Sequence, residues 1–379
     1  AAPRLEAFSA YGSKGFQPRY TISCISSKPL DGSYHLTTQI QYGNKSKNML
    51  IMTKQYVIIL CMYEIIKRVT EYAVSNALTL NSGQKISCAV SGGADSMCML
   101  DILGRLTGTY CFSIDVLHFN HKMRGEESDR DENFVHNYCL EHNLSLTIGH
   151  QNTPLDGSEN AARESRYAFF EENASVVATA HNADDNAETM IANLTRGTGV
   201  NGLSGISPKI TRASGLTVIR PVLCLTRKEI TRYLEYNSIP HIEDSSNSDT
   251  RYSRNLIRSA VMPVLRQINP RIAEHAADTS KSLAEDERCL ATIAKAFLAE
   301  CRFGVSNPLI PRKKFNALDS AIASRVLILA AEVFGVSLFR EHIRDMLDMS
   351  RSGKGGRILT LPKRLIAAFE RAAIVFREN

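Results

Sequence analysis

The feature that most constrains this 379-residue chain is a short glycine-containing segment between two apolar runs. Apolar residues within 86–90 precede it and others within 97–103 follow it, so a buried strand turns abruptly into a helix. The segment itself consists of Ser91, Gly92, Gly93, Ala94, Asp95 and Ser96. Glycines let backbone N–H groups approach a ligand closely, serines add hydroxyl donors, and a helix N-terminus favours an anion. The pattern therefore indicates a phosphate-binding turn in an α/β fold.

The residue types in this turn separate it from the Walker loop, which requires a lysine directly after its glycines. Asp95 instead places a carboxylate where a Mg²⁺ ion bridging pyrophosphate oxygens would sit. The segment resembles the PP-loop of the ATP pyrophosphatase superfamily, whose members cleave ATP between the α- and β-phosphates. The competing interpretation is an ordinary strand-to-helix turn capped by Ser and Asp.

The bulk composition is that of a globular protein, with 44% hydrophobic and 22% charged residues. The net charge of +6 is compatible with a polyanionic partner. Nine cysteines include no C-x-x-C pair, which argues against a disulfide framework and a zinc ribbon and favours a reducing, cytoplasmic location. No run approaches the ~20 uninterrupted apolar residues that cross a bilayer, so no membrane association is expected.

Residues 1–54 differ from the rest of the chain. They are rich in Ser, Gly, Lys and Tyr, lack sustained periodicity and contain no signal-peptide core. We expect an N-terminal extension that is disordered or does not belong to the native start. A transit peptide and an upstream extension of the reading frame, with Met49 or Met52 as the true start, both remain open.

Strand and helix signals alternate through the predicted catalytic domain, residues 55–270, after a helical segment over 57–77. Strands are predicted over 86–90, 112–119, 145–150 and 176–180, and helices over 96–106, 128–142, 159–172 and 184–195. This order predicts a parallel sheet with helices on both faces, and in such a sheet ligands bind at the carboxyl ends of the strands. The motifs SGGADS, HFNH and AHNADD each follow or end a predicted strand, so we expect them to face one crevice.

The composition changes after Pro270, and residues 271–379 are predicted to form a smaller helical domain with a short terminal β element. Helices are expected over 272–298 and 320–334, and strands over 357–361 and 365–376. Between these segments, Arg351, Lys354 and Arg357 surround a glycine-rich loop and are candidate RNA contacts.

A second motif concentrates carboxylates. His181, Asp184, Asp185 and Glu188 stand at spacings of three, four and seven, which predicts that they share one face of a helix. One or two of these carboxylates could hold Mg²⁺ while the imidazole contacts phosphate. Acidic residues in a first helical turn also simply complement the helix dipole, which would explain Asp184 and Asp185 but not the other two.

Arginines form the third signal. Arg163 lies in the predicted helix ARESRY, where its fork suits a phosphate, although neighbouring glutamates offer ordinary ion pairs. Arg251, Arg254 and Arg258, with Tyr252 among them, are typical of a surface that follows an RNA backbone, or of a solvated helix face.

These segments, in this order, resemble the tRNA(Ile)-lysidine synthetase family. The resemblance is dense over residues 86–270 and rests on SGGADS, HFNHKMRGEESDRD, ARESRY, AHNADDNAET, RGTGVNGLSGI, IRPVL and EDSSNSDTRYSRNLIR. It implies a PP-loop (adenine nucleotide α-hydrolase-like) domain followed by a helical tRNA-binding domain. It also implies ATP and Mg²⁺ as cofactors and L-lysine and a tRNA(Ile) with a CAU anticodon as partners. The oligomeric state stays open, with a homodimer as one candidate.

The implied reaction is that of an ATP-dependent carbon–nitrogen ligase, which adenylates the wobble cytidine at its C2 oxygen and then replaces AMP with the ε-amine of lysine. The resemblance places residues 91–96 at ATP and Asp95 and Asp185 at the metal. It makes Asp95, Arg163, His181, Asp185 and Glu188 the catalytic set. It assigns tRNA or substrate binding to Asn247, Arg251, Arg254 and Arg258.

Three alternatives remain at this point. A tRNA thiolase of the same superfamily would need a thiol pair or cluster ligands, and the chain has no C-x-x-C. An amidotransferase such as GMP synthetase would need a glutaminase cysteine. A catalytically silent RNA-binding relative would not need the intact Asp95, His181, Asp185 and Glu188.

Overall fold

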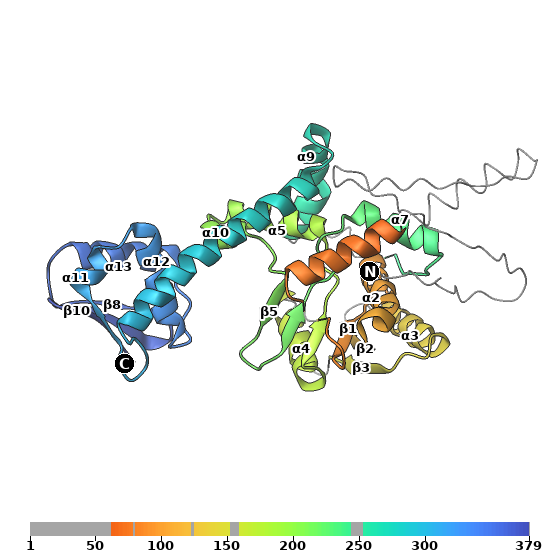
Figure 1. The fold of residues 1–379 in the computed structure, drawn as a ribbon, viewed down its shortest axis with the longest axis horizontal. Helices are drawn as coiled ribbons and strands as arrows, with labels where there is room; N and C mark the ends of the chain where they lie inside the picture. Colours follow the sequence, from red (N-terminus) through yellow and green to blue (C-terminus); the bar gives the residue numbers. More distant parts are fainter. Residues whose placement is uncertain (1–61, 79, 123–124, 152–158, 244–252, 379) are drawn as a thin grey trace, which may run out of the picture. The chain divides into compact units, whose positions relative to one another are not determined.

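The structure is a computed structural model that describes residues 62–78, 80–122, 125–151, 159–243 and 253–378. Its first sheet has six strands in the order β3-β2-β1-β4-β6-β5 (Figure 1). Their bounds are β1 Lys85–Ala89, β2 Ser113–Asn120, β3 Leu146–His150, β4 Val176–Ala178, β5 Lys209–Thr211 and β6 Thr217–Ile219. All neighbouring strands are parallel except β5, which pairs antiparallel with β6 at one edge. The parallel sheet is as predicted, and strands β6 and β5, the latter at the edge, are additions to it.

Helices cover both faces of this sheet, because successive residues of each strand point to opposite sides. Val116 and Ala178 belong to the core under α2, whereas Leu117 and Val177 pack with aromatic residues of α4. The helices here are α2 Ala94–Tyr110, α3 Glu126–Glu141, α4 Glu159–Asn173, α5 Ala183–Thr195, α6 Val200–Leu203 and α7 Arg227–Asn237. Residues 62–75 are also helical, which agrees with the predicted first helix over its described part.

The strand order creates a crevice at one edge of the sheet. Strand β1 pairs with β2 on one side and with β4 on the other, so the connections that follow these strands leave in opposite directions. In parallel sheets this arrangement opens a ligand crevice at the carboxyl ends of the strands. The loops after β1 and β4 both emerge there, and they carry the two strongest sequence motifs.

A π-helical turn, η2 (Ile257–Val261), interrupts the next helical segment between α8 (Ser253–Leu256) and α9 (Met262–Ile268). Pro263 stands at the start of α9, where it lacks an N–H donor and its ring crowds the carbonyl four residues back. A local widening to π geometry relieves that conflict, and such turns occur often at functional sites.

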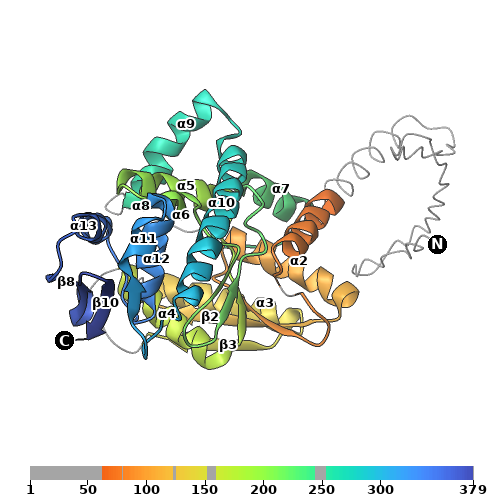
Figure 2. The same ribbon diagram turned by 60° about the vertical axis from the view of Figure 1, so that its left-hand side comes forward.

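The 29-residue helix α10 (Ile272–Glu300) packs beside α5 and α6 and further along against α12 (Figure 2). Its last turns join a separate apolar core that a second sheet, of order β7-β10-β9-β8, completes. The elements here are β7 Leu309–Pro311, α11 Arg312–Asn316, α12 Ser320–Glu332, α13 Arg340–Arg351, β8 Arg357–Thr360, η3 Pro362–Arg364, β9 Leu365–Phe369 and β10 Ala373–Glu378.

The C-terminal region differs from the sequence prediction in its strands. The single strand expected over 365–376 is wrong, because the chain reverses after Phe369 and β9 pairs antiparallel with β10. Strand β7 adds a fourth strand, so the β element is larger than expected. The domain boundaries at 54/55 and 270/271 stay predictions. The expectations for residues 1–54 lie outside the described residues, and no helix in the described part is long and apolar enough to cross a membrane.

Candidate functional site

The turn after β1 has a geometry that only glycine fits at one position. Gly92 has φ +90°, and a Cβ there would lie 2.8 Å from Ile242 Cδ1. The Ile242 N–H donates to the Gly92 carbonyl at 2.9 Å, which ties the turn to a distant segment. Ser96 Oγ donates to the Gly93 carbonyl at 2.9 Å and lies 3.3 Å from Ser91 Oγ. The backbone of the turn is therefore held from both sides, with Ser91 exposed and Ser96 buried.

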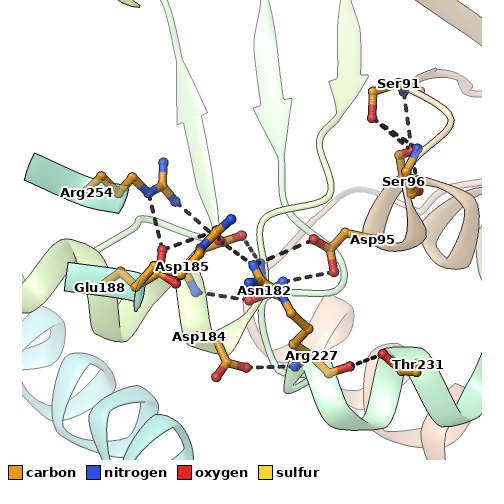
Figure 3. Close-up of polar contacts among 12 residues, drawn as sticks. Ser91, Asp95, Ser96, Asn182, Asp184, Asp185, Glu188, Arg227, Thr231 and Arg254 are labelled. Atoms are coloured by element: carbon orange, nitrogen blue, oxygen red, sulfur yellow. Dashed lines mark hydrogen bonds and ion pairs between the residues drawn. The ribbon is translucent and has the colours of Figure 1, made fainter. Parts of the chain in front are cut away.

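Asp95 connects this turn to the loop after β4. Its side chain is 31% exposed, and Oδ1 accepts a hydrogen bond from Asn182 Nδ2 at 3.0 Å (Figure 3). Asn182 is fully buried and caps α5 in a reciprocal box: its Oδ1 accepts from the Asp185 N–H, and its own N–H donates to Asp185 Oδ2. The predicted meeting of SGGADS and AHNADD at the sheet edge is thus present as a direct contact.

Two arginines from the third sequence motif turn inward to the acidic face of α5. Arg258 Nε donates to Glu188 Oε1 at 2.9 Å, and its Nη2 lies 3.0 Å from Asp185 Oδ1. Arg254 reaches the same two carboxylates at 3.4 and 3.3 Å (Figure 3). Glu188 is completely buried, so these charge-assisted bonds offset the cost of removing its carboxylate from water. The arginines are half-buried internal partners rather than an open basic stripe.

Arg227 also belongs to this cluster, and sequence reasoning missed it. Its Nη2 lies 3.2 Å from Asp185 Oδ1 and 3.9 Å from Asp95 Oδ2, so the guanidinium bridges the two motifs. The sequence contains a signal for the helix start that carries Arg227, because Thr226 and Glu229 form a capping box at the beginning of α7, after β6. Strand β6 is parallel to β4, so this helix start faces the same sheet edge.

Asp184 faces different partners from Asp185. Its Oδ2 accepts the Arg227 N–H at 2.7 Å, and its Oδ1 pairs with Arg266 Nη2 at 2.7 Å. Asp184 therefore fixes the starts of α5 and α7 against each other. This position agrees with the structural alternative for Asp184, and the shared helical face is confined to Asp185 and Glu188.

His181 does not lie on that helix, which corrects the prediction of one shared helical face. Helix α5 begins at Ala183, because the side chain of Asn182 caps it, and His181 stands before that cap. The His181 Nδ1 lies 3.1 Å from Thr179 Oγ1. Burial first, and then the neighbouring Arg220, lower the pKa of the imidazole well below its ordinary value. His181 is consequently neutral near pH 7.

Arg163 packs on an aromatic residue of its own helix, α4. Its guanidinium lies 5.1 Å from the ring centroid of buried Tyr167, on which Arg212 also packs at 4.6 Å. Arg220 is buried nearby, and its Nε has no hydrogen-bond partner among the described residues. Arg212 is paired with Glu164 and Glu171, so Arg163 and Arg220 supply the positive charge on this side of the site.

Several remaining candidates are placed more simply. Asn247, Arg251 and Tyr252 lie outside the described residues. Lys354 and Arg357 are exposed on and beside the loop before β8. His118 is buried, and its Nδ1 lies 2.8 Å from the Val90 carbonyl, so this histidine of HFNH has a structural role.

The carboxylates differ in their fitness for a metal ion. Burial raises the pKa of Asp95, Arg227 opposes this shift, and Asp185 adds to it. A cation at Asp95 would therefore stabilise the charged form of the carboxylate. Asp185 does not fit as it stands, because its Oδ1 contacts three guanidinium groups and its Oδ2 accepts the Asn182 N–H. No three His, Cys, Asp or Glu side chains gather as a metal site in the described part.

Fold and site together define a PP-loop α/β protein. A family model described as a PP-loop domain matches residues 62–265, more than half of the chain. The glycine turn after β1, Asp95 and the acidic helix after β4 all lie inside this match.

Curated relatives define the family more closely. The chain is 38% identical over 253 residues to tRNA(Ile)-lysidine synthase of Bacteroides thetaiotaomicron, covering 64% of this chain and 56% of that protein. It is 31% identical over 331 residues to that of Bacillus subtilis, covering 82% and 70%, and 37% identical over 245 residues to that of Geobacter sulfurreducens, covering 62% and 51%. The chain belongs to the tRNA(Ile)-lysidine synthase family, and its matches span about half to two-thirds of these relatives' lengths.

Proposed function

We propose that this chain is an ATP-dependent tRNA(Ile)-lysidine synthetase. In the first step, the C2 oxygen of the wobble cytidine attacks the α-phosphate of ATP and pyrophosphate leaves. In the second, the ε-amine of free L-lysine attacks C2, and AMP leaves with the oxygen. The observation that carries the proposal is the Asp95–Asn182 contact, which joins the PP-loop to the acidic start of α5 in one crevice.

Each step has residues suited to it. The Ser91–Ser96 turn offers backbone and hydroxyl donors to the leaving pyrophosphate. Asp95 would hold Mg²⁺, which when bound supplies positive charge to the phosphates. Because Asp95 is the one carboxylate that fits among the described residues of the site, the remaining metal ligands would include phosphate oxygens and water, as is common for this ion.

The second substrate is a cation, and the acidic pair on α5 suits it. Asp185 and Glu188 are balanced by Arg254 and Arg258 in the structure, so an incoming ammonium group would compete with these guanidinium groups. The neutral imidazole of His181 has one N–H donor and one acceptor nitrogen, so it can hydrogen-bond to substrate atoms without adding charge to the site. Arg163 lies on the cationic side, where a nucleotide phosphate or an RNA phosphate would be stabilised.

Domain roles follow from the same proposal. Residues 55–270 would carry the chemistry, and 271–379, with exposed Lys354 and Arg357, would contact tRNA. The seven described cysteines are all free thiols, which fits a reducing cytoplasm. The homodimer stays a prediction.

The decisive experiment is incorporation of labelled lysine into a tRNA(Ile) transcript with a CAU anticodon. We expect ATP-dependent incorporation, AMP release that requires lysine, and pyrophosphate exchange that requires tRNA. A transcript whose wobble cytidine is replaced by uridine is the matched control. Sulfur incorporation, or RNA binding with neither AMP nor pyrophosphate release, would contradict the proposal.

A further inference from the structure

Arg227 is the one guanidinium in the described crevice that lies against both the PP-loop aspartate and the acidic helix. Its Nη2 is 3.9 Å from Asp95 Oδ2 and 3.2 Å from Asp185 Oδ1. The contact to Asp95 exceeds hydrogen-bond length, so it is an ion pair without a fixed geometry. Figure 3 shows the side chain extending from the start of α7 toward these carboxylates.

The backbone of Arg227 is held much more firmly than its side chain. Its N–H donates to Asp184 Oδ2 at 2.7 Å, and the helix start around it is closed by the Thr226–Glu229 capping box. Glu229 is in turn paired with Arg68 from the first helix. The backbone of Arg227 is therefore fixed at the start of α7, while its guanidinium makes one hydrogen bond, to Asp185, and one longer ion pair, to Asp95.

The guanidinium retains unused donors. Every contact that it makes with a described residue uses Nη2, and Nε and Nη1 make none. The side chain is 35% exposed, so the guanidinium is accessible to a ligand. By contrast, Arg258 uses both Nε and Nη2 on buried Glu188 and Asp185, as expected for a guanidinium in a fixed internal position.

A phosphate group that enters the site would compete with Asp95 for the Arg227 guanidinium. A doubly or triply charged phosphate competes better for a guanidinium than a partly exposed carboxylate 3.9 Å away, and it accepts two parallel N–H bonds. We propose that Arg227 is a phosphate-binding residue of this site, which bridges Asp95 and Asp185 in the free chain and turns its donors to the nucleotide's pyrophosphate group on binding. The inference deepens the proposed function and rests on it.

The test compares Arg227→Gln and Arg227→Lys with Arg232→Gln, which removes an exposed arginine from the next turn of the same helix. Titration calorimetry in excess Mg²⁺ measures binding of α,β-methylene-ATP, which cannot release pyrophosphate, of inorganic pyrophosphate, and of adenosine. Because one charge-assisted bond is removed, we expect Arg227→Gln to weaken both phosphate ligands about tenfold or more. Arg227→Lys should bind them with intermediate affinity, and adenosine should bind all variants alike.

The outcomes separate the inference from the function on which it rests. Arg232→Gln is expected to match the unsubstituted chain with every ligand. If Arg227→Gln binds both phosphate ligands normally, or loses adenosine to the same degree, Arg227 is structural and the inference is overturned while the proposed function stands. If the unsubstituted chain itself fails to bind α,β-methylene-ATP, the inference and the nucleotide part of the proposed function both fall.

Discussion

Asp95 is surrounded by groups that bear on its charge: the Asn182 amide, the Arg227 guanidinium and the Asp185 carboxylate. Replacement by asparagine keeps the shape and the hydrogen-bond acceptor but removes the charge. We expect Asp95→Asn to lower lysidine formation at least ~10²-fold, the usual scale for one missing electrostatic stabiliser. Because partial burial raises the pKa of Asp95 and so disfavours its charged form, the thermal midpoint of the variant should be normal or slightly higher.

Quantified lysine incorporation and a thermal melt together check this prediction. Asp101→Asn on the same helix is unsuitable as a control, because Asp101 accepts the Tyr233 hydroxyl. Glu141→Gln, at the exposed end of α3, is the better one. Wild-type-like turnover by Asp95→Asn would remove Asp95 from the mechanism.

The depressed pKa of His181 links stability to pH. Below the ordinary imidazole pKa of about 6.5, the unfolded chain binds a proton that the folded His181 rejects. The free energy of unfolding should therefore fall as pH drops from 7 to 5. We expect the fall to be smaller in His181→Gln, measured by urea unfolding at each pH. Identical slopes in the two proteins would show that His181 titrates normally when folded.

At the scale of elements, the turn after β1 makes a prediction about glycine. Gly92 and Gly83 both have positive φ, +90° and +77°, but a Cβ meets Ile242 only at Gly92 and finds open space at Gly83. Gly83→Ala should cost about 1–2 kcal/mol from backbone strain alone. Gly92→Ala should cost at least about 1 kcal/mol more, because Ile242 must also move.

Urea unfolding of both variants measures the two costs on the same scale. Gly92→Ala should additionally weaken binding of α,β-methylene-ATP, since the turn itself shifts, whereas Gly83→Ala should not. Equal destabilisation of the two proteins would mean that Ile242 yields freely and that the turn is not held by it.

The sequence predicted elements whose pattern is long or regular. Strand β2 and helices α2 and α10 are long enough for their patterns to be recognised, and their predicted ranges agree closely with the structure. Strands β5, β6 and β7 have three residues each, too few for a period to be visible. The turn between β9 and β10 contains no Gly or Pro, so nothing in the sequence separated the two strands.

The candidate site was predictable where its residues are close in sequence or follow predicted neighbouring parallel strands, as Asp95 and Asn182 do. The PP-loop and Asp185–Glu188 spacings identified two motifs, whereas the pairing of Glu188 with Arg258 spans 70 residues and depends on tertiary packing. His181 was misplaced because helical spacing continues through it, and only the buried Asn182 cap shows that α5 begins later. Arg227 was missed because the three-residue strand β6 was not predicted, so nothing placed the start of α7 at the carboxyl ends of the strands.

At the scale of the whole molecule, the basic loop before β8 can be tested in the intact chain. Arg312 is buried at its base and donates to the carbonyls of Met349, Ser350, Lys354 and Glu370, so the loop has a defined path. Neutralising Arg351, Lys354 and Arg357 together to glutamine should weaken tRNA binding. It should also flatten the salt dependence by about 0.7–0.9 in log–log slope for each RNA phosphate that no longer has a cationic partner.

Filter binding of tRNA at several salt concentrations provides the measurement. Binding of α,β-methylene-ATP is the internal control and should not change, because these residues lie in the C-terminal elements. An unchanged slope would show that residues 351–357 do not touch RNA and that other cations bind its phosphates.

Helix α10 packs on α5 and α6 near its start, is mostly exposed over 281–290, and enters the second core near its end. Its 29 residues span about 43 Å, and each residue adds about 1.5 Å and 100° of rotation. Substitutions in the exposed stretch change neither the length of the helix nor the rotation between its two ends. One inserted or deleted residue changes both, and it turns every later residue about the helix axis. The middle of α10 should therefore tolerate wide variation in residue type and almost none in length.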